Sequence, residues 1–360
     1  MLEKFRNKSV LVTGHTGFKG TWLVAWLKLL GSNVSGIGLN PNTSPSHFEV
    51  SKMGDGIEDY RLDIRDLTAL TKIIDKIQPD YVFHMAAQPI VNYSYLYPHD
   101  TWSTNVIGTI NILEALRRIE KSCTAIMVTS DKSYENLEWI WGYRENDRLG
   151  GKDPYSASKS AAELAINSYV KSFFNTKENQ ILISTARAGN VIGGGDWSAD
   201  RIVPDIINSW SKKREFLLRN PNSTRPWQHV LEPLGGYLIL ALKTSENKNL
   251  HGEAFNFGPK ESKERSVLDL VETISKYLGN IKWKADLEAA QIGKEANLLR
   301  LNTDKASALL DWNSVLNFQD TVRITAEWYK YYYENKNSII NVTNDQINEY
   351  MKLAEKRYEK

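Results

Sequence analysis

The stretch Thr13-Gly14-His15-Thr16-Gly17-Phe18-Lys19-Gly20 lies between a short β-branched run, residues 9–13, and a segment of helical apolar spacing, residues 18–30. Glycines at such a strand-to-helix turn permit the tight turn and let the backbone approach a pyrophosphate. The unpaired N–H groups at the helix N-terminus then attract the anion. Three spaced glycines alone are weak evidence, but their place in the first strand-to-helix turn predicts a dinucleotide-binding unit rather than a purely structural turn.

Strands and helices alternate through the first half of the chain. Apolar runs of strand length follow at residues 33–38, 81–84, 124–129 and 181–186, and segments with helical spacing at residues 66–77, 101–119 and 154–174. Strands that alternate with long helices form βαβ units, whose parallel sheet is covered on both faces. We therefore predict an α/β fold with a doubly wound, Rossmann-like parallel sheet.

The pattern changes after Arg187. Glycine and proline residues interrupt it, at 193–195, 204, 220–222 and 226. We expect residues 1–186, with a returning segment at about 228–258, to form the dinucleotide-binding domain. Residues 187–227 and 259–360 are expected to form a smaller C-terminal α/β substrate domain, because ligands of α/β proteins bind beyond the strand ends.

Near the end of the chain, Thr343 and Gln346 have the spacing of a capping box, and apolar residues follow on one helical face. This pattern predicts a helix that begins at Thr343 and docks on its own domain. Docking on a partner helix is the alternative.

Composition excludes several classes of protein. The 360 residues are 41% hydrophobic and 24% charged, unlike a disordered or fibrous chain. Forty-five basic against 43 acidic residues leave a net charge of +2, so we expect neither a nucleic-acid nor a membrane partner.

The single cysteine, Cys123, excludes an intrachain disulfide. The N-terminus lacks a signal-peptide pattern, which predicts a cytoplasmic protein. The six histidines lack metal-ligand spacing, so no metal is expected.

The run Tyr155-Ser156-Ala157-Ser158-Lys159 brings a phenol and an ammonium to one helical face. A cation beside a phenol lowers its pKa, ordinarily about 10, so that the phenolate can take a hydroxyl proton near neutral pH. The spacing is common by chance, and a solvated helix face is the alternative. Its position after a strand that ends in Thr129-Ser130-Asp131 favours a catalytic pair.

The glycine loop, Ser130 and the Tyr155–Lys159 pair, in this order, resemble the extended short-chain dehydrogenase/reductase family. The resemblance implies that Tyr155 and Lys159 are catalytic and that Ser130 hydrogen-bonds the substrate hydroxyl. It assigns the dinucleotide to Gly14, His15, Thr16, Gly17, Phe18, Gly20, Asn40, Asp63, Ile64, Ala86, Ala87, Gln88, Asn105, Thr129, Tyr155 and Lys159.

Four of these positions carry specific expectations. His15 is bulky where the family has small residues, so we expect its ring beside the phosphates, where it would crowd the cofactor and weaken its binding or donate a hydrogen bond to it. Asn40 is neither an acid nor an arginine, and no Arg or Lys lies between residues 31 and 50, which favours NAD over NADP. Asp63 either contacts the adenine or is an acid near a helix N-terminus. Asn105 is interpreted as a structural tie.

Asp131 indicates which reaction is catalysed. An acid after the active-site serine resembles the nucleotide-sugar 4,6-dehydratases, which must protonate the C6 oxygen as it leaves as water; a surface carboxylate is the alternative. In the dehydratases with deoxythymidine carriers a second acid follows and removes the C5 proton, but Lys132 stands there in this chain. We expect Lys132 either to be that base, if its pKa is depressed, or to stabilise the enolate.

Longer matches resemble the branch of these dehydratases that acts on CDP-D-glucose. They cover residues 130–136, 139–147, 150–155, 187–197, 200–201 and 225–230. The resemblance implies oxidation at C4 by NAD, loss of water across C5 and C6, and return of hydride to C6. The product, CDP-4-keto-6-deoxy-D-glucose, would feed deoxysugar synthesis for the O-antigen of lipopolysaccharide. The resemblance assigns the substrate to Gln88, Ser130, Asn190, Arg201, Arg225 and His229.

Three alternatives remain at this point. They are a 4-epimerase, a dehydratase for a UDP- or dTDP-sugar, and a non-catalytic NAD-binding scaffold. Asp131 argues against the first, whereas the choice of cytidine depends on resemblance alone. Relatives pair through helices that correspond to residues 101–119 and 154–174, which implies a homodimer or a homotetramer.

Overall fold

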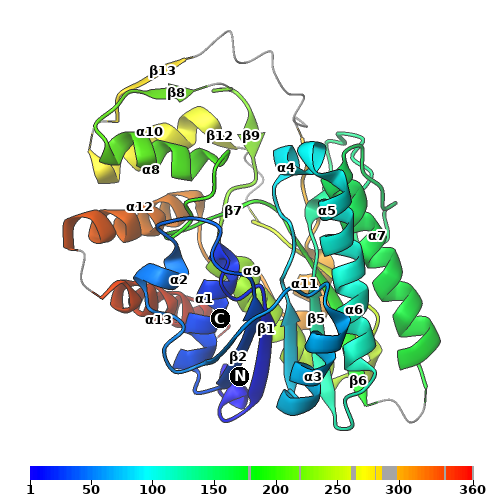
Figure 1. Ribbon diagram of the computed structural model, residues 1–360. Helices are drawn as coiled ribbons and strands as arrows, with labels where there is room; N and C mark the ends of the chain where they lie inside the picture. Colours follow the sequence, from blue (N-terminus) through cyan, green and yellow to red (C-terminus); the bar gives the residue numbers. More distant parts are fainter. Residues whose placement is uncertain are drawn as a thin grey trace.

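The computed structural model describes residues 1–176, 180–218, 220–260, 265–279, 281–285, 298–335 and 338–358. Its centre is a sheet of seven strands (Figure 1). They are β1 (Ser9–Thr13), β2 (Asn33–Gly38), β3 (Glu58–Arg61), β4 (Tyr81–His84), β5 (Cys123–Val128), β6 (Ile181–Ala188) and β11 (Ala254–Phe257). Their order in space is β11-β6-β5-β4-β1-β2-β3, and every neighbouring pair is parallel. The order reverses between β1 and β4, and such a reversal opens a crevice at the carboxyl edge of a sheet. The predicted doubly wound α/β fold is confirmed.

Helices cover both faces of the sheet, which explains why the central strands are continuous apolar runs. One face carries α1 (Phe18–Leu29) and α9 (Leu231–Glu246), with Trp22 and Trp26 of α1 buried in the core. The other face carries α3 (Leu67–Ile77), α6 (Gly108–Leu116) and α7 (Pro154–Tyr169). Figure 1 shows these two layers on opposite sides of the strands.

The other elements surround the carboxyl edge and one flank of the sheet. The remaining helices are α2 (His47–Val50), α4 (Val91–Leu96), α5 (Pro98–Trp102), α8 (Ile202–Ser211), α10 (Val267–Leu278), α11 (Asp304–Leu310), α12 (Phe318–Asn335) and α13 (Ile339–Tyr358). The short strands pair as β7 (Val191–Ile192) with β10 (Gln228–His229), β8 (Phe216–Leu218) with β13 (Trp283–Ala285), and β9 (Thr224–Arg225) with β12 (Arg265–Ser266). In Figure 1, α8, α10, β8 and β13 lie together above the sheet.

The two long helices predicted beside the sheet contain π-helical turns. In the predicted segment 101–119, α5 leads through a π-helical turn, Ser103–Ile107, into α6. The predicted segment 154–174 is α7 followed by a second π-helical turn, Val170–Phe174. Asp153 caps α7 by accepting a hydrogen bond from the Ser156 N–H, which fixes where this helix begins.

The capping box predicted at Thr343 is wrong, because α13 begins four residues earlier at Ile339. Thr343 lies inside the helix and is completely buried. Its hydroxyl is hydrogen-bonded to Nε2 of His47 (3.0 Å) and accepts a bond from Nε1 of Trp328 (3.0 Å). α13 packs on α1 and α12 of the same chain, so these polar partners serve tertiary packing rather than a helix end.

The division into two domains stays a prediction. After the segment that carries α8 and the first short strands, the chain returns through α9, which packs on β5 and β6, and through β11, which extends the main sheet beside β6. No helix among the described residues is both long and apolar enough to cross a membrane.

Candidate active site

The glycine loop connects β1 to α1 at the carboxyl edge of the sheet. Gly14 has a φ of +73°, and a Cβ at this residue would lie 2.8 Å from the Cα of Ala86. A Cβ on Gly20 would lie 2.1 Å from the carbonyl oxygen of Gly14. Both approaches are too close for any residue with a side chain. The first N–H groups of any α-helix lack an intrahelical acceptor, and Gly17, the N-cap of α1, has no side chain that could accept from them. This cradle fits the pyrophosphate of a dinucleotide.

His15 does not lie beside the phosphate cradle. Its completely buried ring packs on β2, where a Cβ on Gly36 would lie 2.3 Å from the ring. Nε2 of His15 is hydrogen-bonded to Oδ1 of Asp59 on β3 (2.8 Å), and burial lowers the pKa of the ring. The expectation that the ring crowds the cofactor is therefore wrong, because Gly36 leaves space for it beneath the strand.

The ends of β2 and β3 lie together beyond the cradle. Asn40 is exposed there, as a cofactor-facing residue would be. The carbonyl oxygen of Leu39 accepts hydrogen bonds from the hydroxyl of Thr16 (2.8 Å) and from Nη1 of Arg61 (3.2 Å). The guanidinium of Arg61 on β3 thus lies next to the end of β2, although residues 31–50 contain no arginine. Arg61 is itself paired with Asp59.

Asp63 and Ile64 follow β3. Asp63 is paired with Arg65, whose hydrogen bond lowers the pKa of the Asp63 carboxyl. Asp66, not Asp63, caps α3 by accepting a hydrogen bond from the Ala69 N–H (3.0 Å). Ile64 is buried, and its side chain occupies the space that a Cβ on Gly108 would need. An adenine contact by Asp63 stays a prediction.

Asn105 forms the structural tie that was expected of it. Its Oδ1 accepts a hydrogen bond from the Gln88 N–H (2.8 Å), and its Nδ2 donates to the carbonyl of Gln88 (3.1 Å) and to the hydroxyl of Ser158 (2.9 Å). Asn105 therefore connects the segment after β4 to α7. Ala86 and Ala87, half-buried and without long side chains, keep the carboxyl end of β4 accessible.

The predicted catalytic residues converge where β5 ends and α7 begins. Ser130 accepts a hydrogen bond from the Lys132 N–H (3.2 Å) and donates one from its hydroxyl to Oδ1 of Asp131 (3.0 Å). It also hydrogen-bonds the phenol of Tyr155, which lies in the first turn of α7, one turn before Lys159. Lys132 is half-buried, whereas the other four side chains are buried.

Burial determines the proton affinities in this cluster. It raises the pKa of the Asp131 carboxyl, despite the charge of Lys132, and so favours the acid form that can donate a proton. It raises the pKa of Tyr155 to about 12, although Ser130 and Arg201 act in the opposite direction. It lowers the pKa of Lys159 to about 8. Within the chain itself, burial therefore outweighs the charge of Arg201, and the phenolate expected near neutral pH stays a prediction.

Two further side chains border the cluster and were not singled out from the sequence. Nζ of Lys19, in the first turn of α1, donates to the hydroxyl of Tyr237 (3.2 Å) and interacts electrostatically with Asp131 and Lys159. Gln228 is buried, and a Cβ on Gly189 would lie 3.1 Å from Oδ2 of Asp131 and 4.0 Å from Nε2 of Gln228. The only sequence signal for Lys19 was its place in the glycine-rich motif, and the only one for Gln228 was its place in the match over residues 225–230.

Of the predicted substrate residues, Arg201 lies near the phenol of Tyr155, whose pKa its charge lowers. Nη1 of Arg201 donates to Oδ2 of Asp196 (2.8 Å). Asn190 is exposed between β6 and β7. The amide of Gln88 is turned towards α5, where its Nε2 donates to the hydroxyl of Thr101 (2.8 Å).

His229 is not placed to bind a substrate. It is completely buried, its ring meets the edge of Trp22 at 5.7 Å between centroids, and burial lowers its pKa to about 3. Its Nδ1 accepts a hydrogen bond from the Leu231 N–H (3.3 Å). The assignment of His229 as a ligand is therefore wrong, because the ring of this β10 residue is buried against Trp22 of α1.

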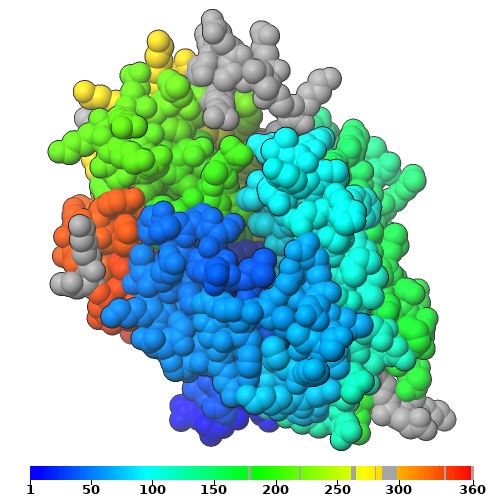
Figure 2. Space-filling view, in the orientation of Figure 1, coloured from blue at the N-terminus to red at the C-terminus, as the bar shows by residue number. Residues whose placement is uncertain are grey.

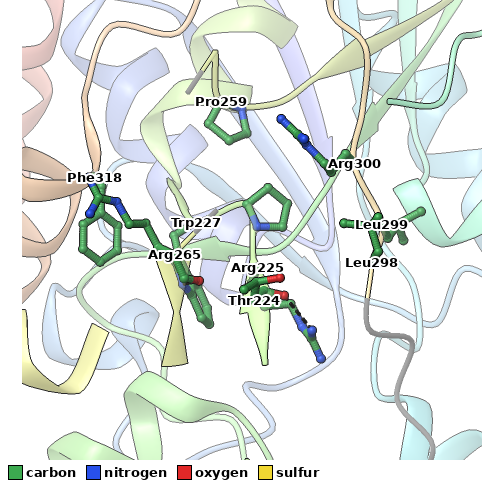
Figure 3. A pocket seen from close by; sticks show the side chains of 10 residues that line it. Thr224, Arg225, Trp227, Pro259, Arg265, Leu298, Leu299, Arg300 and Phe318 are labelled. Carbon is green, nitrogen blue, oxygen red and sulfur yellow. Dashed lines mark hydrogen bonds between the residues drawn. The ribbon is translucent and has the colours of Figure 1, made fainter. Parts of the chain in front are cut away.

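Arg225 lines a separate pocket that contains three arginines (Figure 3). Its lining comprises Thr224, Arg225, Pro226, Trp227, Pro259, Arg265, Leu298, Leu299, Arg300 and Phe318. The guanidinium of Arg265 lies over the ring of Phe318, 5.1 Å from its centroid, and its buried Nε has no hydrogen-bond partner among the described residues. Positive charge, an aromatic wall and an unused donor suit a phosphorylated ligand.

Figure 2 shows the surface hollowed between the blue and cyan segments of the N-terminal half. In Figure 1 these colours mark the chain from β1 to α6.

Comparisons with known proteins agree with this geometry. The sequence pattern of the family described as GDP-mannose 4,6 dehydratase matches residues 11–325. The chain is 41% identical to a CDP-glucose 4,6-dehydratase of Salmonella typhimurium over 357 residues, which cover 98% of this chain and 99% of that one. Among solved structures, a dTDP-glucose 4,6-dehydratase from Bacillus anthracis in complex with NAD is 21% identical, with a TM-score of 0.73 over 92% of this chain and 99% of that one. A UDP-glucose 4-epimerase from Thermus thermophilus in complex with NAD is 21% identical, with a TM-score of 0.73 over 89% and 98%.

Proposed function

The chain belongs to the GDP-mannose 4,6-dehydratase family, and on this premise we propose that it converts CDP-D-glucose to CDP-4-keto-6-deoxy-D-glucose with NAD as its cofactor. The observation that carries the proposal is the buried Asp131 carboxyl, hydrogen-bonded to Ser130 and next to the phenol of Tyr155. An epimerase or a simple reductase has no leaving group to protonate, whereas a dehydratase requires such an acid.

In the proposed mechanism, Tyr155 takes the proton from the 4-hydroxyl of glucose while Ser130 hydrogen-bonds the same oxygen. The chemistry that NAD supplies when bound is the reversible storage of the C4 hydride, together with a positive charge that favours the phenolate of Tyr155. The backbone N–H groups at the start of α1 would hold its pyrophosphate. The resulting 4-ketone acidifies the C5 hydrogen, and Asp131 then protonates the C6 oxygen, so that water leaves.

Lys132 remains the proposed group for the C5 step, as the base or as the cation that stabilises the enolate. Lys132 directly follows Asp131, the acid proposed to act on C6, in the chain. Its backbone N–H donates a hydrogen bond to the hydroxyl of Ser130. An enolate at this position would be stabilised by the ammonium of Lys132 in a water-poor site, and burial lowers the pKa of the neighbouring Lys19 to about 7.

The nucleotide end of the substrate is proposed to lie in the three-arginine pocket. The Arg265→Gln variant is expected to raise the KM for CDP-D-glucose about tenfold, because it loses a charged donor, while kcat changes little. Initial rates over a range of substrate concentrations measure this. Arg118→Gln is the control and should leave KM unchanged, because Arg118 is exposed, pairs with Asp75 of α3 and does not line the pocket.

The choice of sugar nucleotide is tested by incubation with CDP-glucose, UDP-glucose, dTDP-glucose and GDP-mannose, with and without added NAD. A 4-keto-6-deoxy product, detected by its absorbance in base, is expected from CDP-glucose at the highest rate. A galactose nucleotide as the product would instead assign a 4-epimerase. Absence of turnover with all four would assign a non-catalytic scaffold.

We also propose that the protein is a homo-oligomer, with a dimer as its unit. Exposed apolar side chains lie on the helices that the family uses for pairing, namely Trp102, Ile107, Leu164 and Phe173. Exposed apolar patches of this kind are typical of interfaces.

The single cysteine is buried and free, which suits the reducing cytoplasm as the proposed compartment.

The Leu164→Asp variant is expected to convert the dimer to monomers, because it introduces a charge into the proposed interface. Leu309→Asp is the matched control, since Leu309 is similarly exposed but lies on α11. Size-exclusion chromatography with light scattering measures both variants. A monomeric wild type, or an unchanged mass for Leu164→Asp, would contradict the proposal.

A further inference from the structure

A buried ion pair lies behind the catalytic residues and takes no part in the mechanism above. Glu163 is on α7, one turn after Lys159, and Arg187 is near the end of β6. Each side chain is 4% exposed. Nε of Arg187 donates to both carboxylate oxygens of Glu163 (2.8 and 2.9 Å), and Nη2 donates to Oε2 (2.5 Å).

Glu163 also holds the strand end that carries the catalytic serine and acid. The hydroxyl of Thr129 donates to Oε1 of Glu163 (2.7 Å). Ser130 and Asp131 are the next two residues of the chain. One carboxylate therefore connects the end of β5 to α7 and, through Arg187, to β6.

Arg187 extends the connection to the segment that follows the catalytic turn. Its Nη1 donates to the hydroxyl of Tyr134 (2.6 Å) and to the carbonyl oxygen of Glu145 (2.9 Å). The hydroxyl of Tyr134 donates in turn to Oδ1 of Asn256 on β11 (2.8 Å). Buried polar networks with satisfied members rigidify what they connect.

Glu163 is also the acidic group that acts on the Lys159 ammonium. Residues four apart on a helix are neighbours, and an opposite charge favours the charged form of a buried amine. The other titratable groups that interact with Lys159 from facing elements are Lys19 of α1 and His84 of β4. Burial lowers the pKa of Lys19 to about 7, so its amine repels the Lys159 ammonium only when it is protonated. Burial keeps His84 neutral by lowering its pKa to about 3.

We propose that Glu163 is a positioning residue for the reaction, which keeps the Lys159 ammonium charged and holds the Thr129–Asp131 segment against α7. This inference rests on the proposed function, because it gives Lys159 and Asp131 their catalytic roles.

The expected pH effect follows from the sign of this interaction. Burial lowers the pKa of Lys159 to about 8, and the charge of Glu163 raises it. Without that charge the ammonium loses its proton at lower pH. The Glu163→Gln variant is therefore expected to lose activity at a pH about one unit below that at which the wild type loses it.

The test compares Glu163→Gln with Arg187→Lys. Both variants disturb the buried pair, but only the first removes the carboxylate charge. The alkaline limb of kcat/KM should move to lower pH in Glu163→Gln and stay in place in Arg187→Lys. If both variants lose activity uniformly at every pH, the pair is merely structural and the proposal fails.

A second readout does not depend on turnover. Titration of the Lys159 side chain is followed by NMR with isotopically labelled lysine, and its signal is assigned by its loss in Lys159→Arg. The midpoint should fall by about one pH unit in Glu163→Gln. An unchanged midpoint would overturn the inference, even if the chain turned over none of the nucleotide sugars. If Glu163→Gln does not fold, the double variant Glu163→Gln/Arg187→Met removes both charges. Its midpoint should also fall, but by less, because the repulsion by Arg187 is removed together with the attraction by Glu163.

Discussion

The Tyr155→Phe variant is expected to dehydrate CDP-D-glucose at a rate lower by a factor of about 10³ to 10⁴, the upper part of the range for loss of a positioned acid–base group. The hydroxyl that it removes is the one that takes the 4-hydroxyl proton, and without oxidation at C4 neither the C5 proton nor the C6 oxygen becomes reactive. The ring itself is retained, so packing around the buried residue changes little. Single-turnover assays with bound NAD measure the rate directly.

Tyr169→Phe is the matched control, because Tyr169 lies on the same helix and its hydroxyl also makes a hydrogen bond, to Glu114 (2.7 Å). Its dehydration rate should equal that of the wild type. CDP binding, measured by calorimetry, should be unchanged in Tyr155→Phe. Near-normal dehydration by this variant would remove Tyr155 from the oxidation step.

The Asp131→Asn variant is expected to separate oxidation from elimination. The amide occupies the same volume but cannot give a proton to the C6 oxygen, so dehydration should fall by a factor of about 10² to 10⁴. Oxidation at C4 and exchange of the C5 hydrogen should continue, since Tyr155, Lys159 and Lys132 are intact. The measurement is deuterium incorporation at C5 of recovered substrate in D₂O, compared with product formation.

The same variant has an expected effect on stability, which follows from the raised pKa of Asp131. Burial disfavours the carboxylate form of Asp131 in the folded protein. Above the ordinary pKa of this group the unfolded chain is ionised, so burial lowers the free energy of unfolding of the wild type. This loss of stability disappears as the pH falls below that pKa. Asp131→Asn should therefore raise the melting temperature at pH 7 and have little effect at pH 3.5.

Asp131→Glu, which retains the acid, should recover part of the dehydration.

Local patterns in the sequence predicted the elements that depend on short-range physics. The glycine loop, the strand ends and the start of α7 were predicted because φ preferences, capping and apolar periodicity act within a few residues. The grouping of Ser130, Asp131, Tyr155 and Lys159 was predicted from the order of the motifs and the family resemblance.

The errors and omissions arose where distant residues decide the outcome. His15 turns beneath β2 because Gly36, on another strand, leaves room for its ring. Thr343 caps nothing because His47 and Trp328 supply its hydrogen bonds. The phenol of Tyr155 has a raised pKa because the whole fold buries it, and no local spacing reports burial. Lys19 lies within the recognised glycine-rich motif, but only the position of Tyr237 shows where its amine goes.

The most direct test of internal redox uses CDP-D-glucose that carries deuterium at C4, incubated with the protein and NAD in ordinary water. Because the hydride that leaves C4 is stored and returned within one turnover, the account predicts a 4-keto-6-deoxy product with deuterium at C6. A product without deuterium at C6, or label found in released NADH with no loss of water, would contradict it.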